Sequence, residues 1–283
     1  MDQALAGMAV RDILRRNLKM SRSLYRKVWA GRGVTVDGQA VEPFSRLAVG
    51  QTLMVAIAAR TRVEPEEMEL AVLFEDEDVV VIDKPAGLVV HPTKGFSAGT
   101  LAGGLAHRYG AFHLIGRLDQ FTSGVLVVAR HPLAAQRLTA SLARKALGRT
   151  YLAVVHGRPD LPEGRIDAPI ARVPGAGRRA IDPSGQPAIT HYRELREMEV
   201  GGLAATLVEL TLETGRNHQI RVHVTHIGHP VLGDDRYGPA EPAWPRLCLH
   251  SSRVVFPHPA TGATITVTAP WPSDLPPMPI GPV

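Results

Sequence analysis

Residues 112–129 read FHLIGRLDQFTSGVLVVA, and this stretch decides the local fold because a polar turn separates two apolar runs. The runs 112–115 and 125–129 are both typical of strands, the second of them buried. Asp119 therefore lies where a strand meets a loop, a position in which folded scaffolds commonly hold reactive groups. A plainer interpretation is that Asp119 caps the turn and pairs with Arg117.

The composition predicts one large domain and a small one. The chain has 283 residues, of which 45% are hydrophobic and 21% are charged, enough to bury a sizeable core. The single cysteine, Cys248, excludes an intramolecular disulfide and a cysteine zinc cluster, and it favours a reducing compartment. The N-terminus has no signal-peptide pattern, and no apolar stretch reaches membrane-spanning length. We therefore expect a cytoplasmic protein without a membrane partner.

Basic charge is concentrated at the start of the chain. Residues 1–62 contain 11 Lys and Arg against 4 Asp and Glu, a net charge of +7, whereas residues 63–283 have a net charge of −2. A concentrated patch favours a polyanionic partner, because each neutralised phosphate releases counterions. The alternative is a basic surface that is merely solvated.

The first 60 residues are predicted to form a compact module of two short helices and a small sheet. The segment 20–23, MSRS, offers a cap for the second helix, which ends near Gly31. Asp37-Gly38 is a two-residue hairpin signal between the strands 34–36 and 39–41, and another strand covers 52–55. The outward face of the second helix is basic and carries Arg22, Arg26 and Lys27. A polar linker is placed at 61–69.

Residues 70–270 are predicted to form a single α+β domain, followed by an irregular, Pro-rich tail at 271–283. A helix starts at Pro132 and runs to about Lys145. Residues 158–187 are rich in Gly and Pro and are predicted to be a loop. Strands are expected at 70–74, 79–82, 150–155, 203–212 and 264–269.

The segment 214–223, TGRNHQIRVH, places several polar side chains among apolar ones. An alternating strand would put Ile220 on one side and Arg221 on the other. Arg221 then reaches solvent or finds a carboxylate. If that carboxylate is Asp119, the guanidinium keeps it ionised; an ion pair without a catalytic role is the alternative.

Other chemistries are poorly supported. The histidines at 218, 223, 226 and 229 lack the spacing of zinc hydrolases, so no metal site is predicted. Ser123 lacks the nucleophile-elbow pattern, and no phosphate-binding or dinucleotide loop is present. Cofactor-free chemistry is the natural inference. Tyr151, early in a strand, is either a stacking platform for a base or an ordinary core residue.

Several ordered motifs closely resemble the RluA family of RNA pseudouridine synthases over most of residues 70–260. The first module resembles the alpha-L RNA-binding domain of a small-subunit ribosomal protein and of tyrosyl-tRNA synthetases. The catalytic-domain motifs occur in the family's order, at 84–92, 117–124, Tyr151 with Ala153 and Gly157, 215–221, 226–230, 233–238, 249–250 and 256–259.

The resemblance implies a bent mixed, mostly antiparallel sheet with a central cleft, and conversion of selected uridines in RNA to pseudouridine. It implies that Asp119 is the catalytic carboxylate, acting as a nucleophile on the sugar or base or as a base on the sugar. Tyr151 would stack on the uracil, and Arg221 would hold Asp119. Arg117 would occupy the space of a flipped-out nucleotide. The remaining substrate contacts are assigned to Leu118, Ile220 and His218.

The chain departs from the family pattern at four positions, Gly116, Arg149, Gln186 and Asn217, which bear on substrate choice. We expect a monomer that acts on large-subunit ribosomal RNA, with transfer RNA as the alternative substrate. A non-catalytic RNA-binding or ribosome-assembly factor is a second class of function. A glycoside hydrolase ranks last because it needs two acids.

Overall fold

The computed structural model describes residues 5–57, 63–93, 95–239 and 244–278. Its main feature is a ten-stranded mixed sheet in which β7 and β14 are the parallel neighbours and the other pairs are antiparallel. This agrees with the predicted α+β class. The order along the sheet is β4 (Val72–Glu75), β5 (Val79–Lys84), β7 (Ser123–Ala129), β14 (Leu249–Pro257), β8 (Gly148–His156), β13 (Leu203–Leu212), β12 (Ile189–Val200) and β9 (Glu163–Asp167), with β6 (His113–Ile115) on β7 and β15 (Thr264–Thr268) on β14.

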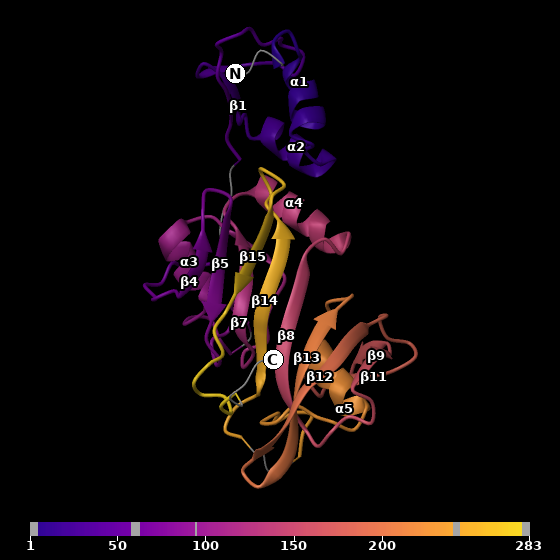
Figure 1. The fold of residues 1–283 in the computed structure, drawn as a ribbon. Coiled ribbons are helices and arrows are strands. Elements are labelled where there is room, and N and C mark those ends of the chain that lie inside the picture. Colours follow the sequence, from indigo (N-terminus) through magenta and orange to yellow (C-terminus); the bar gives the residue numbers. More distant parts are fainter. Residues whose placement is uncertain (1–4, 58–62, 94, 240–243, 279–283) are drawn as a thin grey trace.

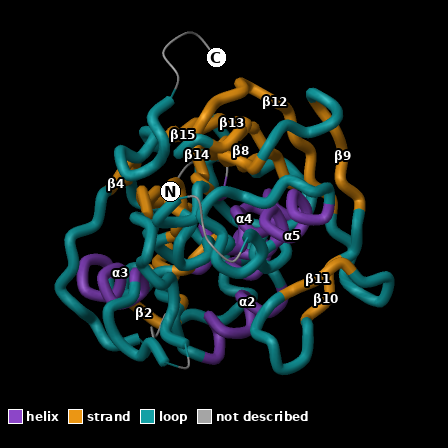
Figure 2. The backbone as a smooth tube through the Cα atoms, turned by 90° about the horizontal axis from the view of Figure 1, so that it is seen from below, coloured by secondary structure: helices purple, strands orange, loops and turns teal. Residues whose placement is uncertain are grey.

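Helices cover both faces of one half of the sheet. Along β5, Val79 and Val81 belong to one buried cluster and Val80 and Ile82 to another, as the two-residue period of a strand requires. Helix α4 (Pro132–Ala143) packs on the first cluster, and α3 (Leu101–Tyr109) and α5 (Gln219–His226) pack on the second. Seen from below, the strands from β4 to β9 form an arc, with α5 on its inner side (Figure 2).

The N-terminal module has its own buried cluster. It consists of α1 (Val10–Asp12), η2 (Ile13–Asn17), α2 (Arg22–Ala30) and the sheet β1 (Val34–Val36), β2 (Gln39–Ala40) and β3 (Leu53–Val55). The Ser21 hydroxyl accepts the Leu24 N–H at 3.2 Å and so caps α2. Asp37 and Gly38 both have positive φ, 49° and 80°, as a two-residue hairpin turn requires.

The module is fastened to α4 of the larger domain. The Gln136 amide donates to the Lys19 carbonyl at 2.8 Å and accepts the Ser21 N–H at 2.7 Å, while Arg137 donates to the Leu18 carbonyl at 3.2 Å. Leu133 packs against the module's apolar cluster. Figure 1 shows the module directly beyond α4, at the top of the view.

Three regions differ from the sequence-based description. Residues 158–187 are not a continuous loop, because they contain β9, β10 (Ile170–Arg172) and β11 (Arg179–Ile181); hydrogen bonding of β9 to β12 and of β10 to β11 overrides the Gly and Pro content. Residues 63–69 pack on α3, where Glu66 accepts the Gly99 N–H at 2.6 Å. The irregular segment 270–278 is also packed, with Leu275 only 2% exposed.

A fourth corrected region concerns the site directly. Residues 219–226 form helix α5, so the predicted strand at 214–223 is wrong. The β-branched composition favours a strand, but tertiary contacts decide the outcome: Ile220 and Val224, four residues apart, face the main core, and Val222 packs on a separate cluster. No helix in the described part of the chain is long and apolar enough to cross a bilayer.

Candidate active site

Asp119 lies in the turn that connects β6 to β7, at one edge of a cleft. The turn begins at Gly116, whose φ of +91° is readily available only to glycine. It ends at Gly124, where any side chain would collide with the Ser251 carbonyl of the neighbouring parallel strand β14. The two glycines therefore fix where the turn leaves β6 and where it joins the sheet. The Asp119 side chain remains 20% exposed.

A buried lysine supports the turn from below. Lys84, at the end of β5, has no exposed surface, and its ammonium donates to the carbonyls of Pro85, Leu88 and Gln120 at 2.7, 2.9 and 2.8 Å. Burial lowers the pKa of Lys84 to about 7, the negative charge of Asp119 opposes this shift, and Arg246 adds to it. Lys84 thus connects the segment that follows β5, at Pro85 and Leu88, to Gln120, the residue after Asp119.

Arg221 connects Asp119 to a second, fully buried carboxylate. Its Nη1 donates to Asp119 Oδ2 at 3.4 Å, and its Nε and Nη2 donate to Asp234 at 2.8 and 2.7 Å. The Asp234 side chain has no exposed surface, and that of Arg221 is 7% exposed. Asp234 also accepts the backbone N–H groups of Arg236 and Tyr237, both at 3.0 Å. The bidentate pair leaves one edge of the guanidinium directed at Asp119.

A histidine lies near the same carboxylate oxygen. His218 Nε2 is 4.0 Å from Asp119 Oδ2, and Nδ1 is 2.6 Å from the Tyr237 hydroxyl, which accepts the Arg179 N–H at 2.8 Å. With the hydroxyl proton directed at Nδ1, the ring proton lies on Nε2, facing Asp119. Burial lowers the pKa of His218, although Asp119 opposes the shift, so burial favours the neutral form of the imidazole.

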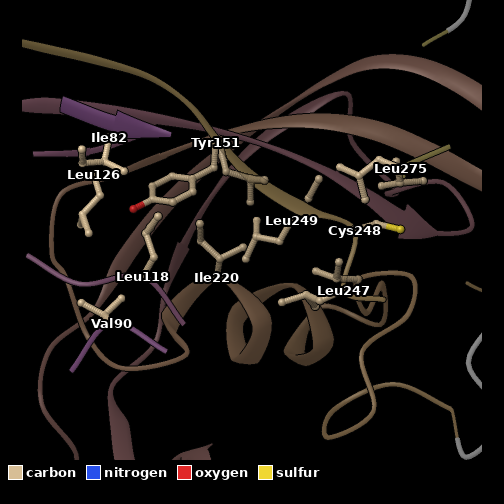
Figure 3. Packing of buried hydrophobic residues seen from close by; sticks show 14 of the residues in the cluster. Ile82, Val90, Leu118, Leu126, Tyr151, Ile220, Leu247, Cys248, Leu249 and Leu275 are labelled. Atoms are coloured by element: carbon tan, nitrogen blue, oxygen red, sulfur yellow. The ribbon is translucent and has the colours of Figure 1, made fainter. Parts of the chain in front are cut away.

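The residues predicted from sequence for the catalytic domain line one small cavity of about 50 Å³. Arg117 is exposed at its rim, whereas Leu118, Tyr151 and Ile220 are 7%, 4% and 4% exposed. Figure 3 shows the Tyr151 ring above Leu118 and Ile220. The structure therefore brings together all seven of these predicted residues: Arg117, Leu118, Asp119, Tyr151, His218, Ile220 and Arg221. The three basic residues of α2 belong to the N-terminal module and do not line this cavity.

Sequence reasoning gave no role to Asp234 or Tyr237. Both lie in the segment 233–238, GDDRYG. The signal available there was an acid that follows a glycine and lies close to an aromatic residue. One departure from the family pattern lies next to another. The Arg149 guanidinium lies beside Gly116, where a methyl group would lie 3.3 Å from Nη1. A side chain at 116 would require this guanidinium to shift.

The histidines at 223 and 229 form hydrogen bonds with groups outside the cavity of Asp119. His223 bonds the Thr190 hydroxyl and the Ala168 carbonyl at 2.8 and 3.0 Å, and His229 bonds the His156 carbonyl at 2.9 Å. Among the described residues, one group has metal-ligand spacing, Asp76, Asp78 and His258, with donor atoms within 4.8 Å of one another. His258 already donates to Asp76 at 2.7 Å, so these contacts close the acidic turn before β5.

The chain is similar to proteins of one known family. Residues 78–226 match the sequence model of the RNA pseudouridylate synthase family. An RNA pseudouridine synthase of Bacillus subtilis, YhcT, described as uncharacterized, is 36% identical over 95% of this chain and 91% of its own length. Ribosomal large subunit pseudouridine synthase D of Xanthomonas campestris is 40% identical over 85% of this chain and 78% of its own.

A solved structure has the same fold. Human RNA pseudouridylate synthase domain containing 1 superimposes with a TM-score of 0.61 at 27% identity, covering 74% of this chain and 86% of its own. The family match spans the Asp119 turn, β8 with Tyr151, and α5 with Arg221. The chain therefore belongs to the RNA pseudouridylate synthase family, as a pseudouridine synthase of the RluA type.

Proposed function

We propose that this pseudouridine synthase isomerises uridines in large-subunit ribosomal RNA, with Asp119 as its catalytic carboxylate. The observation that carries the proposal is the placement of Asp119 in a cavity that Arg221, His218 and Tyr151 also line, with Arg221 and His218 both directed at its Oδ2. Relatives that cover most of the chain are named ribosomal large subunit pseudouridine synthases, which supports the choice of RNA.

The roles of the cavity residues follow from their charges and positions. Isomerisation detaches uracil from the ribose through nitrogen and reattaches it through carbon. The Arg221 guanidinium donates to Asp119, and this carboxylate acts as the nucleophile or as the base. Tyr151 supplies a flat apolar surface for the uracil, with Leu118 and Ile220 completing the walls. Arg117, exposed at the rim, takes the place of the nucleotide that leaves its stack.

The N-terminal module is proposed to hold the RNA. Arg11 lies over the Phe44 ring at 4.8 Å, and Arg15 donates to the Met20 carbonyl at 2.8 Å, so these two cations have partners within the module. Among the described residues, no hydrogen bond or ion pair engages the exposed side chains of Arg22, Arg26 and Lys27 on α2. Unpaired cations on one exposed helix face suit a phosphate backbone.

The substrate is tested by incubating the protein with transcripts of large-subunit ribosomal RNA and of transfer RNA, followed by nucleoside analysis. We expect pseudouridine in the ribosomal transcript at one or a few positions and none in transfer RNA. Pseudouridine in transfer RNA alone would replace the proposed substrate by the alternative. Transcripts from cells with and without the gene product provide the matched comparison.

Replacing Arg22, Arg26 and Lys27 together by Gln is expected to weaken binding of the ribosomal transcript and to flatten its salt dependence. Each lost phosphate contact lowers the slope of log K against log salt by about 0.7 to 0.9. Filter binding between about 50 and 200 mM KCl measures this. Because these side chains are exposed, the thermal midpoint should stay unchanged. A slope equal to that of wild type would refute the role of the module.

A further inference from the structure

A second, larger cavity opens beside the one that contains Asp119. Its volume is about 570 Å³, and its lining is rich in cationic side chains. Asp119 is one of its lining residues, so the cavity is continuous with the edge of the candidate active site. Five basic residues line it, namely Arg117, Lys145, Arg149, Arg179 and Arg216.

The acidic residues of this cavity already have partners. Glu213 accepts Lys145 at 2.6 Å and His191 at 2.7 Å, and these bonds hold the pKa of Glu213 at about 2. Asp119 faces Arg221. Neither carboxylate therefore neutralises the remaining cations. Within the described residues, no hydrogen bond or ion pair engages the guanidinium of Arg149 or of Arg179.

The Arg149 guanidinium lies beside two glycines. A methyl group at Gly116 would lie 3.3 Å from Nη1, and one at Gly215 would lie 3.1 Å from Nη2. A side chain at either position would therefore crowd the guanidinium, whereas glycine leaves room for it. The guanidinium presents its N–H groups in a planar fork that matches the geometry of a phosphate.

We infer that Arg149 and Arg179 form a subsite for a phosphodiester of the RNA strand that flanks the uridine in the cleft. The inference rests on RNA being the substrate and extends it to a named contact. A planar, unpaired guanidinium binds a phosphate through two parallel hydrogen bonds, and phosphate is the anionic group of an RNA strand. The position of the subsite next to Asp119 makes the bound phosphate an anchor for the nucleotide that reacts.

The test measures binding of a single-stranded oligouridylate as a function of KCl concentration. Arg149→Gln is expected to bind about tenfold more weakly than wild type, because a hydrogen-bonded charge contact is lost, and to lower the salt slope by about 0.7. Arg149→Lys should keep the slope, since the charge remains, but bind more weakly because the fork is lost. Arg179→Gln is a second variant with the same expected loss of slope.

The matched control is Arg253→Gln. Arg253 is an exposed arginine on β14 that pairs with Thr150, so its side chain lies on the face of the sheet opposite to Arg149. Its removal should leave the slope of wild type. Equal slopes for Arg149→Gln and wild type, or an equal loss in Arg253→Gln, would overturn the subsite. Oligouridylate binding does not depend on which RNA is the natural substrate, so failure of the ribosomal assignment alone would leave this difference in slope intact.

Discussion

Asp119→Asn is expected to lower the rate of pseudouridine formation by about 10⁴-fold or more, a loss typical of the removal of a central catalytic group. Asparagine has nearly the same shape and still accepts the Arg221 N–H, which lies 3.4 Å from Oδ2 in the wild type. It has no negative charge, so it acts neither as a nucleophile nor as a base. Arg221 remains fixed by Asp234 in this variant.

Single-turnover formation of pseudouridine in the ribosomal transcript, followed by nucleoside chromatography, measures this loss. Asp235→Asn is the matched control, because Asp235 is also near Arg221, at 3.6 Å, yet its side chain is 69% exposed. We expect the control to keep wild-type turnover. RNA binding by Asp119→Asn should persist, since the basic residues are untouched. Full turnover by this variant would remove Asp119 from the mechanism.

Asp234→Ala is expected to reduce the free energy of unfolding by about 3 to 5 kcal/mol, the usual cost of leaving one member of a buried ion pair without its partner. Arg221 would keep its charge with 7% of its side chain exposed and lose two hydrogen bonds. The backbone N–H groups of Arg236 and Tyr237 would lose their acceptor as well. Urea unfolding, followed by circular dichroism, measures the change.

A double variant identifies the origin of this loss. Arg221→Met combined with Asp234→Ala removes both charges, so we expect it to unfold at a higher urea concentration than Asp234→Ala alone. If the loss of unfolding free energy in the double variant equals the sum of the losses in Arg221→Met and Asp234→Ala, the buried charge is not the cause. In conditions under which Asp234→Ala stays folded, its kcat should fall more than its KM rises, because Arg221 no longer orients Asp119.

The turn that carries Asp119 was predictable from sequence because its cause is local. Two apolar runs around a polar segment specify two strands and a turn, and residues 113–115 and 123–129 form them. The surroundings of Asp119 were less accessible. Arg221 does meet Asp119, but it does so from a helix rather than from the predicted strand. Short helices of β-branched residues depend on packing that the local sequence does not encode.

The role of Asp234 was not predictable, since its partner is placed by the tertiary fold. The carboxylate is 13 residues from Arg221 along the chain, and nothing in the periodicity of either segment brings them together. Lys84 is a similar case. Its structural role comes from three carbonyls that accept its ammonium protons, two from the segment after β5 and one from Gln120 in the turn. Convergence of this kind becomes visible only in three dimensions.

Gln136 and Arg137 fasten the N-terminal module to α4, and this fixes the distance between the module and the cleft. With the module as the proposed RNA-binding element, the spacing between its basic helix and the cleft is the same for every RNA. Engagement at one point raises the effective concentration at the other only for an RNA whose folded shape matches this spacing. A uridine is then selected in two ways: by the nucleotides next to it, and by its distance from the RNA phosphates that the basic helix binds.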